Sequence, residues 1–385
     1  MMIMLKESNS LISILIRKVR KVMLILSSFI ILCIVALFII LLIQSPGKVK
    51  PLLNENGDII KGSISEKVYA NINGANMGMI IKSKDLSNPV LLFVHGGPGM
   101  PEYEFTEKYP TGLEENFTVV WWDQRGSGLS YNSDAIKEKM TTEQFVLDTI
   151  EVSKYLCERF GKDKIYLMAH SWGSYIGIQA AEKTPELFYA YIGIGQITNQ
   201  IESEKAAYDY MINYYKDAGN EKVVNKLQGL SFKNMDYMPK EYDKIRDDVM
   251  HKAGIGTMNE MKSVISGIFM TVMENTEYTL GEKINIWKGK AFSKSTNLNE
   301  ELYNSDLRNK ITKLKVPVYF FSGIYDYTVN HSMTEDYLKK IDAPIKGFYL
   351  FKESAHSPIF EEPKKMMQIM QEDVINRKNN LVDTY

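Results

Sequence analysis

The sequence predicts an α/β fold in which a mostly parallel sheet, flanked by helices, carries an inserted helical cap and is preceded by one transmembrane helix. Three observations lead to this prediction. Short apolar runs alternate with a segment of helical periodicity, as in sheets built from strand–helix–strand units. This alternation stops between residues 198 and 309 and then resumes. An uncharged apolar stretch at residues 22–43 precedes the whole pattern.

The apolar stretch at residues 22–43 fits a membrane anchor. As a helix rising about 1.5 Å per residue, it is long enough to cross the roughly 30 Å hydrocarbon core of a bilayer. Basic residues are more numerous before it than after it: Arg17, Lys18, Arg20 and Lys21 precede it, and Lys48 and Lys50 follow. This bias predicts a single-pass protein with a cytoplasmic N-terminus (residues 1–46) and a domain outside the cytoplasm. A cleaved signal peptide is the alternative, but residues 44–47 do not form a small-residue cleavage site.

The rest of the chain divides into a linker, a core in two parts and the cap. Residues 47–66 are expected to be a polar linker, and residues 67–197 and 310–385 the two parts of the core. The expected strands are a hairpin at 67–82, turning at Asn73-Gly74, and apolar runs at 89–94, 117–122, 165–168, 189–194, 316–322 and 348–351. Helices are expected at 141–160 and 363–376 in the core. In the cap, residues 198–309, they are expected at 202–218 and 258–273.

Composition excludes several classes of function. The chain has 46 basic and 47 acidic residues, and because five of the basic and one of the acidic ones lie in residues 1–46, the remainder is mildly acidic. Such a balance does not indicate nucleic-acid binding. The sequence contains no zinc-type Cys/His spacing, phosphate-binding glycine loop or dinucleotide fingerprint, so we expect no metal and no cofactor. Cys33 and Cys157 are the only cysteines, and Cys33 lies in the apolar stretch, so no disulfide is expected in the domain.

Ser171 is the candidate nucleophile. It follows the apolar run at 165–168 and precedes a helix-like segment, with Ala169 two residues before it and Gly173 two residues after it. A serine between small residues at a sharp strand-to-helix turn is typical of a nucleophile elbow, which exposes the hydroxyl above the sheet. The usual pattern has glycine where this chain has Ala169. Taken alone, the serine could also be an ordinary helix N-cap.

Asp326 and His356 supply the acid and base that a serine nucleophile requires. Both follow expected strands, and the order serine, acid, histidine along the chain is the one used by this type of sheet. An isolated loop aspartate is usually a turn former, but the combination favours a triad. The other histidines fit less well: His251 lies in the cap, His331 starts a helix, His95 belongs to another motif, and His170 adjoins the serine and is expected to point away from it.

The motif HGGPG at residues 95–99 predicts an oxyanion hole. Its glycines leave room for a reacting carbonyl to approach the backbone directly after a strand. The expected N–H donors are those of Gly97 and of Trp172, the residue after the nucleophile. A plain glycine turn is the alternative interpretation.

Three segments together resemble the proline iminopeptidase (prolyl aminopeptidase) family of α/β-hydrolases: HGGPG at 95–99, WDQRGSGLS at 122–130 and SWGS at 171–174. The resemblance implies an α/β-hydrolase fold, a triad of Ser171, Asp326 and His356, and release of an N-terminal residue, often proline, from short peptides. It gives the loop at 123–130 a structural role around the pocket. It also implies acidic cap side chains that bind the substrate amine; the candidates are Glu202, Glu204, Glu274 and Glu277.

The sequence thus predicts a membrane-anchored serine hydrolase that acts by acyl transfer on a short peptide or another small molecule, without nucleic acid. A carboxylesterase or lipase-like hydrolase on the same triad is the first alternative. A binding protein that keeps the fold without turnover is the second. Oligomeric state is left open.

Overall fold

The computed structural model describes residues 2–131, 140–230, 232 and 237–383, with side chains from residue 16 onward. Residue 1 of the expected anchor segment, residues 132–139 and 384–385 of the expected core, and residues 231 and 233–236 of the expected cap lie outside the described residues.

Eight strands in the described residues form one sheet, in the order β1-β2-β4-β3-β5-β6-β7-β8. The strands are β1 (Ile64–Ile72), β2 (Ala75–Ser83), β3 (Val90–Val94), β4 (Thr118–Trp122), β5 (Ile165–His170), β6 (Phe188–Ile194), β7 (Val318–Gly323) and β8 (Lys346–Phe351). Pairing from β4 through β8 is parallel, whereas β1 and β2 form an antiparallel hairpin at one edge. The predicted mostly parallel sheet is confirmed, and β1 begins at Ile64, earlier than expected.

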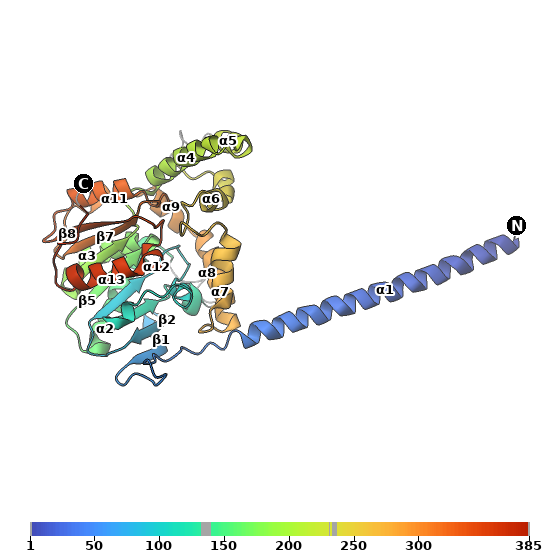
Figure 1. Cartoon of the computed structure of the whole chain (residues 1–385), viewed down its shortest axis with the longest axis horizontal. Coiled ribbons are helices and arrows are strands. Elements are labelled where there is room, and N and C mark those ends of the chain that lie inside the picture. The colour runs from blue at the N-terminus through green and yellow to red at the C-terminus, as the bar shows by residue number, and fades with distance from the viewer. Residues whose placement is uncertain (1, 132–139, 231, 233–236, 384–385) are drawn as a thin grey trace.

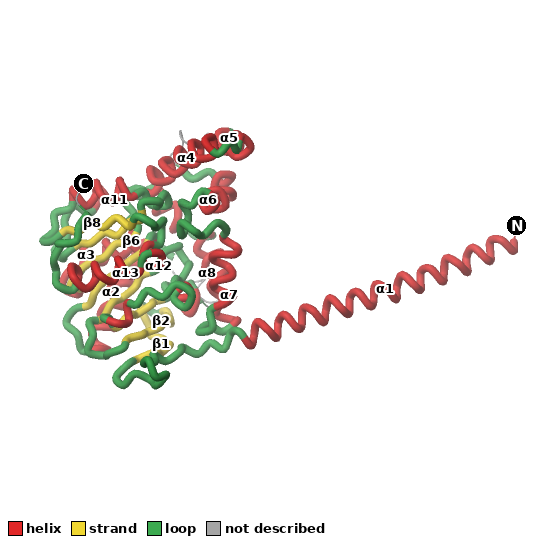
Figure 2. The backbone as a smooth tube through the Cα atoms, viewed as in Figure 1, coloured by secondary structure: helices red, strands yellow, loops and turns green. Residues whose placement is uncertain are grey.

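Helices cover both faces of the sheet because its central strands are apolar on both faces. In β3, Leu92 packs in one apolar cluster with residues of α2 (Thr142–Phe160), α3 (Trp172–Lys183) and α11 (His331–Lys340). Its neighbours Leu91 and Phe93 pack in a second cluster on the opposite face. That cluster contains residues of α12 (Pro358–Glu361), α13 (Pro363–Ile369), the π-helix η8 (Met370–Val374) and the cap. Figure 2 shows the strands in the middle of the domain with helices around them.

The cap is the chain between β6 and β7. Its helices are α4 (Gln200–Asp217), α5 (Glu221–Gln228), α6 (Lys240–Lys252), the π-helix η7 (Ile265–Phe269), α7 (Met270–Glu274), α8 (Leu280–Lys294), α9 (Leu298–Tyr303) and α10 (Leu307–Lys310). Part of it has an apolar cluster of its own around Tyr208, Met211, Leu227 and Tyr242. Figure 1 shows these helices stacked beside the sheet as a separate layer.

One cap prediction is wrong in its extent. A helix was expected over 258–273, but helical structure begins close to Ile265. The preceding segment is a loop: Gly254 has a φ of +76°, and the Asn259 backbone N–H donates to the Glu361 carboxylate at 2.6 Å. A contact with a residue far along the chain therefore replaces the helical hydrogen bond.

Ahead of the domain, α1 (Met2–Ile43) extends away from it (Figure 1). Its residues Ile16–Ile43 contain a window of mean hydropathy 3.2, none of it buried in the protein. A helix of this length and composition fits a membrane anchor or a signal sequence. Short 3-10 turns complete the described elements: η1 (Tyr103–Phe105), η2 (Leu113–Glu115), η3 (Gly128–Ser130) and η5 (Pro185–Leu187).

Candidate active site

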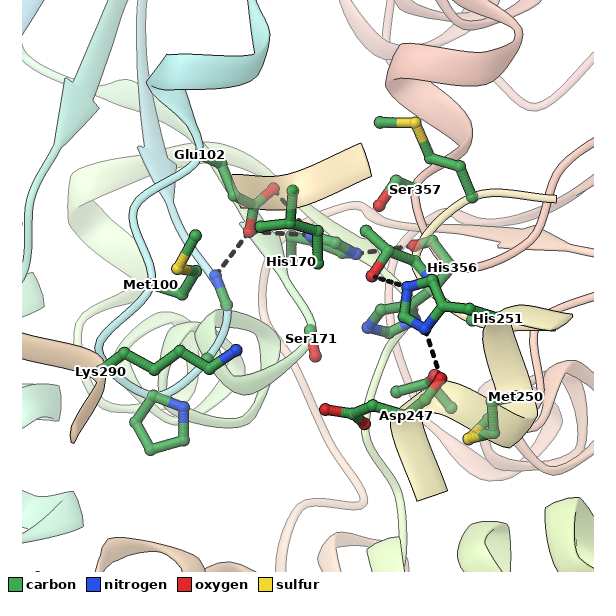
Figure 3. A pocket seen from close by; sticks show the side chains of 18 of the residues that line it. Met100, Glu102, His170, Ser171, Asp247, Met250, His251, Lys290, His356 and Ser357 are labelled. Atoms are coloured by element: carbon green, nitrogen blue, oxygen red, sulfur yellow. Dashed lines mark hydrogen bonds and ion pairs between the residues drawn. The ribbon is translucent and has the colours of Figure 1, made fainter. Parts of the chain in front are cut away.

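Ser171 occupies a strained turn between β5 and α3. Its backbone has φ 53° and ψ −122°, a conformation that costs a non-glycine residue energy and clusters at functional sites. The close approach of α3 to β3 requires glycine after the serine, since a Cβ on Gly173 would lie 2.0 Å from the Val94 carbonyl oxygen. The turn leaves Ser171 half-buried and lining a cavity (Figure 3).

Ala169 fits the turn although most elbows have glycine there. The reason lies on the facing helix: a Cβ on Gly177 would lie only 2.8 Å from the Cβ of Ala169. The methyl group of Ala169 thus uses space that Gly177 leaves free.

Asp326 and His356 form a buried pair at the carboxyl ends of β7 and β8. The Nδ1 of His356 lies 2.9 Å from Asp326 Oδ2, and Asp326 Oδ1 accepts the Val329 backbone N–H at 2.8 Å. Gly195 makes this possible, because a Cβ there would lie 2.9 Å from the His356 ring. Within the described residues Nε2 of His356 has no hydrogen-bond partner, so it can face a substrate or the serine hydroxyl.

The backbone N–H groups of Gly97 and Trp172 have no acceptor within the described part of the chain, and both residues line a cavity that includes Ser171. Their loops are fixed by Gln124, whose Nε2 donates to the His95 carbonyl at 2.6 Å and whose Oε1 accepts the Trp172 indole N–H at 3.1 Å. Burial lowers the pKa of His95 to about 4, so its ring is neutral, and its Nε2 accepts the Gln124 N–H at 3.0 Å. The loop at 123–130 therefore braces both sides of the expected oxyanion hole.

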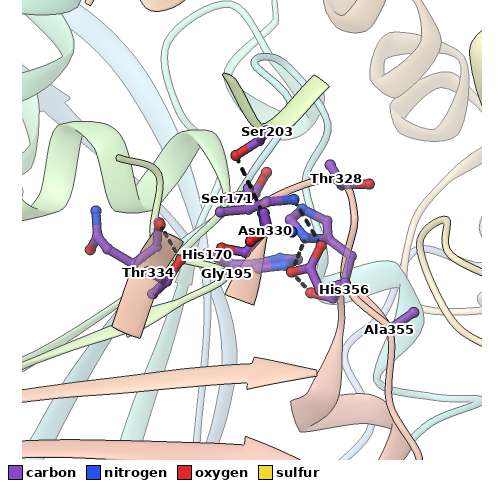
Figure 4. A network of polar contacts seen from close by, with 12 residues as sticks. His170, Ser171, Gly195, Ser203, Thr328, Asn330, Thr334, Ala355 and His356 are labelled. Carbon is purple, nitrogen blue, oxygen red and sulfur yellow. Dashed lines mark hydrogen bonds and ion pairs between the residues drawn. The ribbon is translucent and has the colours of Figure 1, made fainter. Parts of the chain in front are cut away.

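The structure also brings together Glu102 and His170, a pair that the sequence analysis missed. Both side chains are buried, and the Nδ1 of His170 lies 2.8 and 2.9 Å from the two carboxylate oxygens of Glu102. The other ring nitrogen, Nε2, lies 2.7 Å from the backbone carbonyl oxygen of His356. Glu102 also accepts the Gly96 N–H at 2.7 Å. The pair thus links the HGGPG loop to the loop of His356 (Figure 3), and Figure 4 shows His170 beside His356.

The pKa shifts of this pair indicate that it is ionic. Burial by itself would lower the pKa of His170, but the Glu102 charge and hydrogen bond outweigh it and raise that pKa above the usual value. Burial likewise opposes ionisation of Glu102, and the His170 charge outweighs this and lowers the carboxyl pKa. His170 was expected to point away from Ser171. Its ring nitrogens face Glu102 and the His356 carbonyl, the residue lines the same cavity as Ser171, and its ring centroid lies 4.6 Å from that of His356.

The cavity lined by Ser171 and His356, of about 260 Å³, lies between the core and the cap. The core contributes Ser171, His356 and the 96–98 loop. The cap contributes charged side chains of both signs: Asp243, Arg246, Asp247 and His251 from α6, and Lys290 and Lys294 from α8. Figure 3 shows Asp247 and Lys290 on the cavity side, near Ser171. A substrate that carries charges can therefore be paired inside this cavity.

Of the four cap glutamates considered for the substrate amine, Glu204 is the one that lines a cavity with Ser171. It is buried and ion-paired with Arg246 at 2.6 Å. The other three form ion pairs away from the two cavities beside Ser171: Glu202 with Arg308 at 2.7 Å, Glu274 with Lys108 at 3.6 Å and Glu277 with Lys82 at 2.9 Å. The Glu274 and Glu277 pairs join the cap to the core, whereas the Glu202 pair lies within the cap.

Among the described residues, no group of three or more His, Cys, Asp or Glu side chains is arranged to hold a metal ion.

Comparison with known proteins assigns the family. The family model for the alpha/beta hydrolase fold matches residues 89–363, most of the chain. The chain belongs to the α/β-hydrolase family. Within it, the chain is 34% identical over 305 residues to the "Probable aminopeptidase YbaC" of Bacillus subtilis (strain 168), covering 79% of this chain and 94% of that protein.

Two further relatives agree with this placement. The chain is 23% identical over 315 residues to a proline iminopeptidase of Saccharolobus solfataricus, covering 80% of this chain and 91% of that protein. The crystal structure of the proline iminopeptidase of Mycobacterium smegmatis matches the fold with a TM-score of 0.51 at 13% identity, over 81% of this chain and 98% of that one. The chain is thus a proline iminopeptidase-like α/β hydrolase, as the three sequence segments predicted.

Proposed function

We propose that this chain is a membrane-anchored serine hydrolase, an aminopeptidase that releases N-terminal residues from short peptides by acyl transfer. The observation that carries the proposal is that three elements meet around two adjoining cavities, both of which Ser171 and Gly97 line. These elements are Ser171 in its strained turn, His356 with its partner Asp326, and the unpaired N–H groups of Gly97 and Trp172.

In the proposed reaction, Ser171 Oγ attacks the carbonyl carbon of the substrate while His356 Nε2 takes its proton. The N–H groups of Gly97 and Trp172 stabilise the negative charge that develops on the carbonyl oxygen. His356 then gives the proton to the leaving amine, and the C–N bond breaks. Water, deprotonated by His356, hydrolyses the acyl-enzyme, and the proton returns to Ser171. Asp326 holds the imidazole in the required tautomer throughout.

The substrate amine is proposed to bind at the cap side of the cavity. Asp247 faces the cavity near Ser171 (Figure 3), and Glu204 lines the adjoining one. Although burial opposes its ionisation, Arg246 outweighs this and lowers the pKa of Asp247, so its carboxylate is charged at neutral pH. A charged carboxylate next to the serine suits the ammonium group of a peptide N-terminus.

The test is a substrate panel on the full-length protein. Proline and other aminoacyl nitroanilides are compared with the same amides blocked by N-acetylation and with short acyl esters. The proposal predicts turnover of the free aminoacyl amides and loss of turnover on acetylation. Ester turnover without any aminoacyl amide turnover would make the protein an esterase, and no turnover of either class would favour a binding protein.

The anchoring part of the proposal rests on the hydropathy of Ile16–Ile43 and on the four basic residues at 17–21, which precede the uncharged stretch at 22–43. Protease added to cells freed of their wall should digest the domain and leave the N-terminus intact. Protection of the domain until the membrane is opened would reverse the topology.

A further inference from the structure

Hydrogen bonds hold the C-terminal end of α1 directly against the cap. The ammonium of Lys283 in α8, a fully buried residue, donates to the Gln44 carbonyl at 3.4 Å, the Ser45 hydroxyl at 2.8 Å and the Met273 carbonyl at 2.7 Å. The Gly47 N–H then donates to the Thr276 carbonyl at 3.2 Å. The residues that join α1 to the expected linker are therefore packed against the corner where α7 meets α8.

This attachment places the corner near the end of the apolar helix. Because Ile43 and Ser45 are two residues apart, at most about 3.6 Å each, the α7–α8 corner lies within roughly 10 Å of the helix end. Figure 1 shows α1 leaving the domain on the cap side, with its axis running across the axes of α7 and α8. If α1 spans a bilayer along its axis, the sides of α7 and α8 lie along the membrane surface.

Several apolar side chains of η7, α7 and α8 are open to solvent: Ile265 is 71% exposed, Phe269 and Met270 are each 41% exposed, and Ile284 is 45% exposed. Trp287, one turn after Ile284, packs against Phe269 with ring centroids 5.5 Å apart. We call these five residues the cap apolar face. Aromatic rings beside aliphatic side chains are typical of segments at the membrane–water interface.

The same segment forms a wall of the candidate active site. Ile268, between the exposed Ile265 and Phe269, lines the cavity that contains Ser171. Ser266 and Gly267 line a neighbouring cavity together with Phe360. One side of η7 therefore contacts the site, and its other side is apolar and open.

We propose that the cap apolar face lies in the surface of the bilayer that α1 spans, so that the cap sits between the lipid and the core. The proposal rests on the membrane anchoring proposed above, and it adds a second lipid contact that the anchor positions. The lipid partner is the boundary between headgroups and acyl chains, which accommodates exposed Ile, Phe, Met and Trp side chains.

The test measures lipid contact of single sites in full-length protein in nanodiscs. An environment-sensitive NBD fluorophore is attached to a cysteine at Phe269→Cys or at Leu147→Cys, each in a background with Cys33→Ser and Cys157→Ser. Leu147 is the matched control, since it is 45% exposed on α2 of the core. The native Cys33, labelled in a Cys157→Ser protein, is the positive control for the span. Quenching by lipids that carry a spin label high on the acyl chain is then compared among the three sites.

The proposal predicts quenching at residue 269 at least about twofold stronger than at residue 147, and quenching at Cys33. Equal quenching at 269 and 147, with Cys33 quenched, overturns the lipid contact and leaves the anchor intact. An emission shift at 269 that depends on protein concentration and not on quencher lipid would assign the face to a protein contact instead. If Cys33 is not quenched, both the membrane anchor and the lipid contact of the cap apolar face are overturned. Fluorophosphonate labelling of the same samples reports the hydrolase proposal separately.

Discussion

Two carboxylate–histidine pairs lie side by side around Ser171, and they differ in one respect. In the Asp326–His356 pair, Nδ1 faces the carboxylate and Nε2 has no partner among the described residues. In the Glu102–His170 pair, both ring nitrogens are occupied, by the carboxylate and by the His356 carbonyl. A histidine that acts as a general base needs one ring nitrogen free to accept a proton. A histidine that holds two loops together uses both ring nitrogens in hydrogen bonds.

The electrostatics of the two pairs follow this division. The pKa of His170 is raised by the charge of Glu102 against the opposing effect of burial, and each of its ring nitrogens faces an acceptor, an arrangement that suits an imidazolium paired with a carboxylate. The pair joins Gly96 to the His356 loop, and so holds the HGGPG loop next to the proposed base. We therefore expect the Asp326–His356 pair to perform the proton transfers. We expect the Glu102–His170 pair to hold the HGGPG loop and the His356 loop in position.

The largest effect is expected from removing the nucleophile or the base. Ser171→Ala or His356→Ala should each lower kcat by about 10⁶-fold, as in other triads whose members act as a unit, with little change in Tm. Turnover of an aminoacyl nitroanilide measures this, and circular dichroism confirms the fold. If His356→Ala kept most of the activity while His170→Ala lost it, the assignment of the two pairs would be reversed.

Asp326→Asn should lower kcat by about 10⁴-fold, because the amide favours the wrong tautomer of His356 while nearly preserving the geometry. Glu102→Gln is the matched control, a carboxylate-to-amide change in the neighbouring pair. Steady-state kinetics on both variants would show which carboxylate, when replaced, causes the larger loss of kcat. Equal losses would contradict their different roles.

Smaller losses of activity are expected when the Glu102–His170 pair is broken. His170→Gln and Glu102→Gln should each lower kcat/KM by about 10-fold to 100-fold, because misplacement of the oxyanion loop by a fraction of an ångström weakens transition-state contacts. The double variant should lose little more than either single variant, since both break the same link. Full additivity of the two effects would show that the residues act separately.

The smallest effect is a pH dependence of stability. The pKa of His170 is raised above the unfolded value of 6.5, so its stabilising contribution is complete below that pH and is lost as the pH rises through the folded pKa. The difference in Tm between the wild type and His170→Gln should therefore be largest near about pH 6 and narrow towards about pH 9. Thermal unfolding followed by tryptophan fluorescence measures it. A difference that stays constant with pH would show that His170 is neutral in the fold.

The sequence predicted the fold well because its signals are local. Buried parallel strands appear as short apolar runs, and HGGPG and Ser171 each mark the end of such a strand. The approach of Asp326 to His356 followed from chain order, and the structure places them in contact.

Long-range pairing explains what the sequence did not show. Glu102 and His170 are 68 residues apart, and although His170 stands in the nucleophile elbow, nothing in the sequence pairs it with Glu102. The available signal was a bulky titratable residue directly before the nucleophile, where its side chain has to find a partner on a neighbouring loop. Likewise, Glu202, Glu274 and Glu277 looked like free cap carboxylates, because the sequence does not reveal that Arg308, Lys108 and Lys82 lie opposite them.

The central claim is that Ser171 is a nucleophile activated by His356 and not by His170. Labelling of the full-length protein with a fluorophosphonate probe, followed by identification of the modified peptide, tests it most directly. The account predicts labelling at Ser171 in the wild type, none in Ser171→Ala, a rate at least about 10³-fold lower in His356→Ala, and a rate reduced by no more than about 10² in His170→Gln. Labelling at another residue, or a greater loss in His170→Gln than in His356→Ala, would contradict it.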